Sequence, residues 1–287
     1  MKRPSVDFLP TRRAVSGGLA AAAAMCVRPS PLLAETPMTD FTDPNTAMKA
    51  LAKLRGALDE SLVTWWLKGV LYAVVDQEPV KLWGLEVVSF NRWRQLDDAT
   101  YMFNHYELSV KVDPATGAPI DSFVNPYTDE TVPERNDILG PSVLIVSAES
   151  GRLPVDRGPK ATQITHHVGD VATLGDRLWV GQELYATVPP REVGGAPWKA
   201  RDISTYMGTI SAIADDGVAS APAETVYQGF YDWRPWMKMG ATEGFLMARL
   251  AGRKLASADD IPESYTTLAN AIEPAFLAEA DSKVVLP

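Results

Sequence analysis

The pattern of apolar and polar positions changes after one N-terminal helix. Between residues 40 and 59 apolar residues recur at helical spacing, Asp43 can cap the helix, and Pro44 suits its first turn. Beyond it, β-branched and aromatic residues fill long runs separated by short polar connections, which is typical of strands. The expected strands are residues 62–75, 80–93, 101–112, 143–146, 162–168, 177–188, 203–213 and 225–231.

The chain from residue 242 onward is predicted to be mainly helical. Phe245, Leu246 and Leu250 form one apolar stripe, and residues 261–280 contain a second stripe after Pro262.

Seven or more long strands without helices between them indicate a mainly β fold. A sheet of that size has to hide its edges, so we expect a closed or nearly closed antiparallel β-barrel, calycin-like or similar, with an N-terminal helix and C-terminal helices. A β-sandwich is the alternative. The expected organisation is an export signal at residues 1–34, a leader and helix at residues 35–60, and one barrel domain with C-terminal helices at residues 61–287.

The N-terminal segment has the layout of a signal peptide, with basic residues around an alanine-rich apolar run. Arg12 and Arg13 before that run resemble a twin-arginine export signal. Cleavage after Ala34 would remove the single cysteine, Cys26. We therefore expect a periplasmic or secreted protein that uses the twin-arginine export machinery.

The composition of the chain argues against several classes of partner. The formal net charge is −9 and no basic stripe is clustered in the sequence, which argues against nucleic acid. After signal cleavage no run is long and apolar enough for an integral membrane span.

We expect no organic cofactor and no metal, because phosphate-loop and metal-ligand motifs are missing and the adjacent His166 and His167 would point to opposite faces of a strand. The oligomeric state stays open.

Three blocks of residues carry a resemblance to a known family, and they are Trp65–Gly69 with Tyr72–Ala73, Asp113–Gly117 leading to Asn125–Thr128, and Trp233–Gly240. With these blocks the chain resembles the domain-of-unknown-function family 1838 over most of residues 55–262. The resemblance implies an uncharacterised, often exported, barrel-like domain, and it brings no catalytic residues.

Acid–base chemistry is suggested by one face of the strand at residues 101–112. A barrel of about eight strands leaves room for one small ligand, with alternate residues facing inward. Phe103, His105 and Glu107 share a face. In a regular strand His105 and Glu107 would lie about 7 Å apart, too far for a direct bond but close enough to flank one ligand. A solvent-exposed polar face is the alternative.

Further candidates come from the neighbouring strands and the aromatic turn. Arg92 and Tyr185 could stabilise an enolate- or phenolate-like charge, and Glu183, like Glu107, could orient His105 or take a second proton. An ordinary cross-strand ion pair is the alternative for Arg92. The candidate ligand-binding residues are Trp66, Tyr72, Glu86, Phe90, Phe103, Trp179, Tyr206, Trp233 and Trp236.

The leading functional hypothesis is an exported barrel that binds an amphipathic or aromatic small molecule. It would transform that molecule by cofactor-independent acid–base chemistry of the lyase or isomerase type, with His105 as general acid or base. The alternatives are a non-catalytic, lipocalin-like carrier of a small hydrophobic or aromatic molecule and an envelope interaction module.

Overall fold

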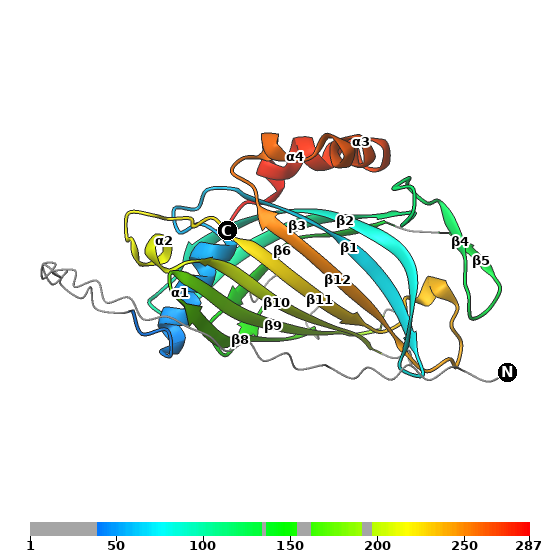
Figure 1. Cartoon of the computed structure of the whole chain (residues 1–287), viewed down its shortest axis with the longest axis horizontal. Coiled ribbons are helices and arrows are strands. Elements are labelled where there is room, and N and C mark those ends of the chain that lie inside the picture. Colours follow the sequence, from blue (N-terminus) through cyan, green and yellow to red (C-terminus); the bar gives the residue numbers. More distant parts are fainter. Residues whose placement is uncertain (1–38, 134–135, 154–161, 191–196) are drawn as a thin grey trace, which may run out of the picture. The chain divides into compact units, whose positions relative to one another are not determined.

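Ten antiparallel strands form one sheet that curls until it is nearly closed into a barrel (Figure 1). The computed structural model describes residues 39–133, 136–153, 162–190 and 197–287, and the expected export signal lies outside them. The strand order is β7-β6-β3-β2-β1-β12-β11-β10-β9-β8. The strands are β1 (Val63–Val75), β2 (Glu78–Gln95), β3 (Tyr101–Val112), β6 (Asp137–Val146), β7 (Gly151–Arg152), β8 (Gln163–Leu174), β9 (Arg177–Val188), β10 (Trp198–Thr209), β11 (Glu224–Tyr231) and β12 (Phe245–Lys254).

The two edges of the sheet meet along part of their length. The backbone N–H of Val168 in β8 donates to the carbonyl oxygen of Ala148 at 2.7 Å, and the His166 ring bonds to the carbonyl oxygen of Ser147 at the same distance. Both carbonyls belong to the segment between β6 and β7. The barrel predicted from the sequence is therefore confirmed, with strand edges that are largely hidden.

One predicted element is wrong, because residues 245–254 form the strand β12 and not a helix. Leu246, Ala248 and Leu250 are buried at every second position, which is the period of a strand. The helical interpretation rested on the spacing of Phe245, Leu246 and Leu250, which also fits a strand with one extra apolar residue. β12 pairs with β1 on one side and β11 on the other, so it joins the first and last parts of the barrel.

Two further boundaries differ from the prediction. β10 begins at Trp198 and ends at Thr209, and the short helix α2 (Ile210–Ala214) follows it. The stretch at residues 125–141 contains β5 (Thr131–Pro133) and the start of β6. β5 pairs with β4 (Ser122–Val124) in a separate hairpin.

Helix α1 (Pro44–Arg55) closes one end of the barrel (Figure 1). Asp43 caps it by accepting a bond from the backbone N–H of Thr46 at 2.8 Å, as the sequence predicts. The buried face of α1 packs in one core cluster with Trp65, Trp93 and Phe103 from the barrel wall. This packing fixes the end of the helix against the lumen.

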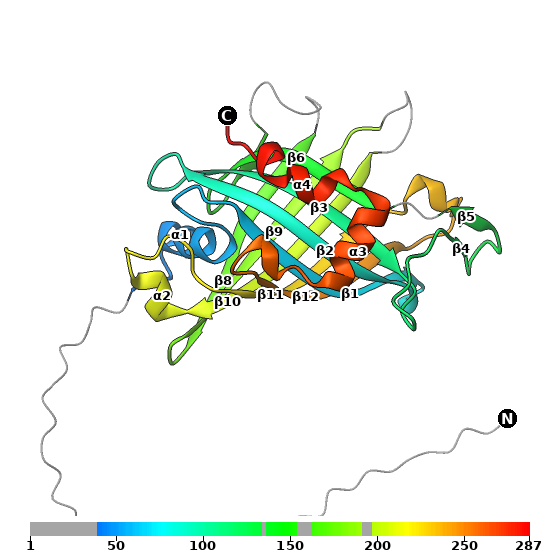
Figure 2. The ribbon, with the colours of Figure 1, turned by 90° about the horizontal axis from the view of Figure 1, so that it is seen from above.

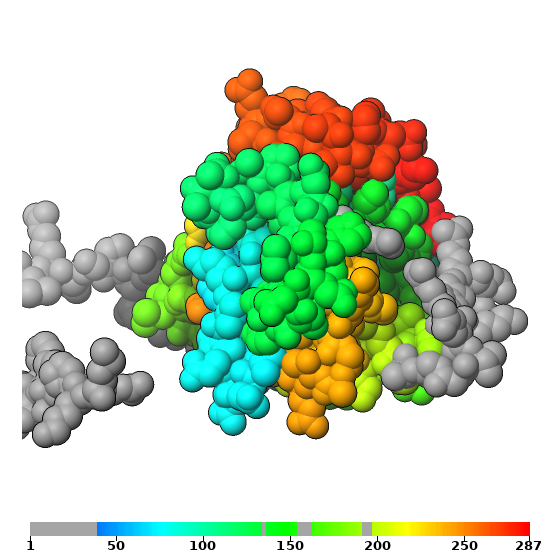
Figure 3. All heavy atoms as spheres, turned by 90° about the vertical axis from the view of Figure 1, so that its right-hand side faces the viewer, coloured from blue at the N-terminus to red at the C-terminus, as the bar shows by residue number. Residues whose placement is uncertain are grey.

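Aromatic side chains fill the opposite end of the barrel. The 3-10 helix η1 (Pro235–Met237) and the β4–β5 hairpin lie over this end (Figure 3). Trp83 contacts Phe123 of the hairpin edge to face, with ring centroids 4.5 Å apart, and stacks at 6.2 Å on Trp236 of η1. Asn125 Nδ2 donates to the carbonyl oxygen of Met237 at 2.8 Å and joins the two segments.

The C-terminal helices cover the outside of the wall. α3 (Glu263–Ile272) follows the short η2 (Ala258–Asp260), and with α4 (Ala275–Lys283) it lies across β2 and β3 (Figure 2). Phe276 packs on Phe90 and Tyr106, with ring centroids 5.5 and 4.9 Å away. The Tyr265 hydroxyl donates to the carbonyl oxygen of Leu108 at 2.7 Å. In the described part of the chain no helix has the length and apolarity to cross a membrane.

The contact between α4 and the outer wall gives the first testable prediction. Phe276→Ala leaves a cavity in a fully buried cluster, so we expect the free energy of unfolding in urea to fall by about 3 kcal/mol or more. Val285→Ala, at a position that is 58% exposed, is the control and should change it by less than about 0.5 kcal/mol. Equal effects of the two substitutions would contradict this packing.

Candidate functional site

A cavity of about 490 Å³ lies inside the barrel and extends from Arg55, the last residue of α1, to Trp236 in η1. Alternate residues of the strands line it, as strand geometry requires. On β3 these are Phe103, His105, Glu107, Ser109 and Lys111, which is the face that the sequence singles out. Apolar and polar groups share the wall, so the cavity is amphipathic.

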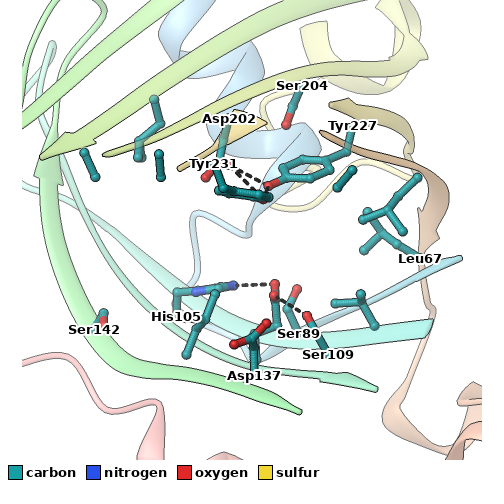
Figure 4. A pocket seen from close by; sticks show the side chains of 18 of the residues that line it. Leu67, Ser89, His105, Ser109, Asp137, Ser142, Asp202, Ser204, Tyr227 and Tyr231 are labelled. Carbon is teal, nitrogen blue, oxygen red and sulfur yellow. Dashed lines mark hydrogen bonds and ion pairs between the residues drawn. The ribbon is translucent and has the colours of Figure 1, made fainter. Parts of the chain in front are cut away.

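A histidine and a glutamate touch each other on this wall (Figure 4). His105 Nε2 lies 3.3 Å from Glu107 Oε2, and the Ser109 hydroxyl donates to Glu107 Oε1 at 3.0 Å. Both charged side chains are 19% exposed. The separation is shorter than the 7 Å expected from the sequence, because long side chains lean along the strand and close the gap between their backbone positions.

The backbone beside this pair is irregular. The register between β3 and β6 shifts between His105 and Glu107. Gly140 of β6 lies opposite the shift with φ of 85°, and a Cβ there would come within 2.1 Å of the His105 carbonyl oxygen. Only glycine fits this close approach, so β6 can pack against the strand segment that presents the pair.

An aspartate and two tyrosines form a second cluster on β10 and β11. The hydroxyl of Tyr227 donates to Asp202 Oδ1 at 2.5 Å, Tyr231 donates to the same oxygen at 3.2 Å, and the two hydroxyls also contact each other. Asp202 pairs in register with Gly229, which lies between the tyrosines. A Cβ at Gly229 would come within 2.2 Å of the Tyr231 hydroxyl, so the absence of a side chain there lets the three groups converge.

Burial controls the protonation of this cluster. Asp202 lies deep in the barrel, and burial raises the pKa of its carboxyl group above the usual value although the Tyr227 hydrogen bond opposes the shift. Burial and the neighbouring Asp202 charge also raise the pKa of Tyr227 and of Tyr231 well above the usual value. Both tyrosines therefore stay neutral hydrogen-bond donors across the physiological range.

The two clusters lie on opposite walls of the same cavity (Figure 4). His105 and Ser109 project from one side, and Asp202, Tyr227 and Tyr231 project from the other. The charge of Glu107 is one of the causes that raise the pKa of Asp202 and of Tyr231, so the clusters interact electrostatically across the lumen.

Cations lie towards both ends of the cavity. Near η1, Lys111 Nζ lies 3.2 Å and Arg234 3.5 Å from Asp137 Oδ2. The Arg234 guanidinium also lies 4.6 Å from the Trp198 ring centroid. At the α1 end, Arg55 donates to Gln182 Oε1 at 2.9 Å.

A chain of hydrogen bonds continues from Arg55 into the barrel wall. Gln182 Nε2 lies 2.8 Å from His166 Nε2, and His166 Nδ1 lies 2.7 Å from the carbonyl oxygen of Ser147. Because a carbonyl only accepts, Nδ1 carries the proton and Nε2 accepts from Gln182. Burial lowers the pKa of His166 to about 4, so this ring is neutral.

Five of the residues singled out from the sequence line the cavity, and they are Phe103, His105, Glu107, Tyr206 and Trp236. Trp233 lies beside them in the aromatic end of the barrel. Its indole N–H donates to the carbonyl oxygen of Thr242 at 2.9 Å, and the residue does not line the cavity.

The candidates on β1 and β2 lie on the outer face, which corrects the expectation that they line the cavity. Trp66 Nε1 donates to Glu86 Oε1 at 3.0 Å there, and Arg92 donates to the carbonyl oxygen of Glu60 and pairs with Asp281 of α4. Phe90 packs on α4, so the apolar residues of this face of β2 are buried by helices from outside. Tyr72 also points outward, next to the inward Leu71.

The candidates on β9 are corrected in the same way. Glu183, Tyr185 and Trp179 alternate with Gln182, Leu184 and Ala186, and the second set faces the cavity. Outside, the Tyr185 hydroxyl bonds to Glu183, and Arg201 lies 4.8 Å from the Tyr185 ring centroid. The sequence shows two faces for this strand and does not show which one is inside.

The main residues that sequence reasoning missed are Asp202 and the polar groups around the two clusters. The predicted strand began at residue 203, one position after Asp202. Tyr227 and Tyr231 alternate on one face with Gly229 between them, and this spacing was the available signal. Other polar lining residues that sequence reasoning missed include Arg55, Ser89, Asn91, Asp137, Ser142, Gln182, Ser204 and Thr225.

The described residues contain no group of three or more His, Cys, Asp or Glu side chains arranged to hold a metal ion. His166 is fully buried and His167 is exposed, so the two rings point in opposite directions.

The fold and the cavity define this protein as a nearly closed β-barrel with an amphipathic lumen that contains titratable groups. The chain belongs to the family described as "Protein of unknown function (DUF1838)", whose model matches residues 59–284. This family is the one that the sequence blocks indicate. A search of curated proteins finds no match to the chain.

The buried histidine predicts an acid-sensitive stability. In the unfolded chain His166 takes up a proton near pH 6.5, whereas in the folded state it does so only near pH 4. The neutral His166 ring therefore stabilises the folded state fully above pH 6.5. This stabilisation, on the order of 3 kcal/mol, is lost as the pH falls to about 4. Urea unfolding at several pH values should show a shallower acid slope for His166→Gln. His167→Gln, at the exposed neighbour, should keep the wild-type slope, and equal slopes for all three proteins would contradict the burial of His166.

The raised pKa of Asp202 predicts a contribution to stability that falls as the pH rises, which is opposite to the trend for His166. The pKa of Asp202 is raised in the folded state, so the folded chain holds the proton more strongly, and this stabilisation is lost as the pH rises through the folded pKa. We expect Asp202→Asn to melt a few degrees above the wild type at pH 8, with a smaller difference at pH 5. Asp170→Asn at an exposed position of β8 is the matched control. A melting temperature that falls at pH 8 would show that the ionised carboxylate stabilises the barrel.

Proposed function

We propose that this barrel binds an amphipathic, aromatic small molecule in its lumen and transforms it by proton transfer, as a lyase or an isomerase. One observation carries the proposal. A histidine–glutamate pair and an aspartate–tyrosine–tyrosine cluster face each other across one cavity whose remaining wall is largely apolar. The pKa values of Asp202, Tyr227 and Tyr231 are raised, and titratable groups with shifted pKa values in a cleft are typical of acid–base sites.

The histidine–glutamate pair supplies the base. The Glu107 carboxylate accepts the Nε2 proton of His105, which leaves Nδ1 with the free electron pair. Nδ1 then takes a proton from a carbon next to a carbonyl group of the substrate. Glu107 holds the ring and stabilises the imidazolium that forms.

The tyrosine cluster supplies the complementary acid. When the carbon loses its proton, the electron pair moves to the carbonyl oxygen. Each hydroxyl has one proton, so the hydroxyl of Tyr227 or of Tyr231 would turn from Asp202 to donate to that oxygen. Asp202 holds the two hydroxyls together. Return of the proton to another carbon gives an isomerase, and loss of a leaving group gives a lyase.

A non-catalytic carrier is the second candidate, and the apolar wall favours it. Leu67, Leu71, Leu246, Ala248 and Leu250 line the cavity and could enclose a hydrophobic ligand without chemistry. A carrier has no need for a buried acid and base in contact with the ligand, so a test of exchange chemistry separates the two functions.

Export to the periplasm or beyond is part of the proposal and rests on the sequence alone. Arg12 and Arg13 before the alanine-rich run support it.

The experiment uses 2-tetralone, an aromatic ketone with acidic methylene protons, in D₂O. Proton NMR measures the exchange of these protons, and calorimetry measures binding. We expect the wild type to accelerate exchange, and His105→Gln to reduce the rate by about 10² to 10⁴ while binding persists. Tyr227→Phe should also slow exchange, by about 10-fold or more.

His167→Gln and Tyr185→Phe are the matched controls, since both residues lie outside the cavity. Binding without exchange would support the carrier and contradict the enzyme. The absence of binding would contradict both.

A further inference from the structure

Arg55 stands at the α1 end of the cavity with its side chain in the lining. Its guanidinium lies 4.7 Å from the Phe103 ring centroid and 5.7 Å from that of Trp93, and NH1 bonds to Gln182. A guanidinium has five N–H donors in a planar fork. Most of these donors have no partner among the described residues of the protein.

The other two strong cations in the lining differ from Arg55. Lys111 and Arg234 both pair with Asp137. Within the ranges that the structure describes, no carboxylate oxygen forms an ion pair with Arg55. The Arg55 charge lowers the pKa of Asp202 from across the cavity, but the two groups form no ion pair. A carboxylate that accepts two parallel bonds from the fork would give the guanidinium a direct partner.

The protein holds Arg55 in place before any ligand arrives. The neutral His166 and Gln182 fix one donor through the hydrogen-bond chain to Ser147. Lys254 Nζ donates to the carbonyl oxygens of Lys53 and Gly56 at 2.8 Å each and so clamps the end of α1 that carries Arg55. A pre-organised donor loses little freedom on binding, which favours affinity.

Aromatic groups surround this end of the lumen. Trp65 and Tyr206 line the cavity and contact each other edge to face at 5.4 Å between ring centroids. The Trp65 indole N–H donates to the carbonyl oxygen of Arg55 at 2.8 Å, so these rings belong to the same structural unit as Arg55. A flat aromatic ring next to the anionic group would be enclosed by them.

We propose that Arg55 anchors a carboxylate of the ligand, so that the cavity takes aromatic carboxylic acids. This inference rests on the proposed binding function and adds the class of ligand. One planar fork matches the two oxygens of a carboxylate. The anchored end then lies near α1, and the rest of the molecule extends along the lumen towards the two titratable clusters.

The test compares two probes of the same shape, 2-naphthoate and the neutral 2-naphthamide, by calorimetry at pH 7 on the full barrel. We expect the wild type to bind the naphthoate about 10- to 100-fold more tightly than the amide. Arg55→Met should abolish this preference and leave amide binding within about twofold. Arg55→Lys should keep part of the preference for the naphthoate, since lysine retains the positive charge but lacks the planar fork of donors.

Arg249→Met, which removes an exposed cation of β12, is the charge-matched control and should keep the wild-type preference. Equal affinity of the wild type for the two probes would overturn the carboxylate anchor and leave the proposed function standing. A preference that survives in Arg55→Met would overturn the role of Arg55. Binding of neither probe would contradict the aromatic-ligand function itself, and the wild-type comparison decides this even if a variant fails to fold.

Discussion

The site depends on the alternation of side chains along β-strands. Each residue of the barrel wall faces either the lumen or the outside, so one inward residue fixes its neighbours at every second position. On β3 this rule brings His105, Glu107 and Ser109 into the lumen together. Buried polar groups are costly unless they pair, and these three pair with one another. The rule therefore assembles a titratable site from one short segment of chain.

The helices and the η1 segment cover the two ends of the barrel and part of its outer wall. α1 and the η1 segment fill the two ends with apolar and aromatic side chains, and α3 and α4 bury the outer face of β2 and β3. Because these helices cover the outside, β2 is buried on both faces, and its inner face can carry Ser89 and Asn91 beside the His105–Glu107 pair. On the opposite wall Gly229 has no side chain, and this leaves room for Asp202 and two tyrosine hydroxyls to meet.

The sequence was sufficient for the barrel and for the β3 face, because strong alternation and turn residues are local signals. It was insufficient wherever the outcome depended on distant packing. Glu86 and Arg92 alternate as regularly as His105, yet α3 and α4, far away in sequence, determine that their face points outward. The three apolar residues of β12 fit the period of a helix as well as that of a strand, and only pairing with β1 and β11 decides between the two. Asp202 was missed because the strand begins earlier than its apolar run.

A crystal structure of the protein with 2-tetralone would show whether the two titratable clusters face one ligand inside the barrel. We expect the ketone in the lumen, with its carbonyl oxygen within hydrogen-bond distance of Tyr227 or Tyr231 and its methylene carbon facing His105. A ketone bound on the outer wall, or a lumen closed by repacked side chains, would contradict this expectation.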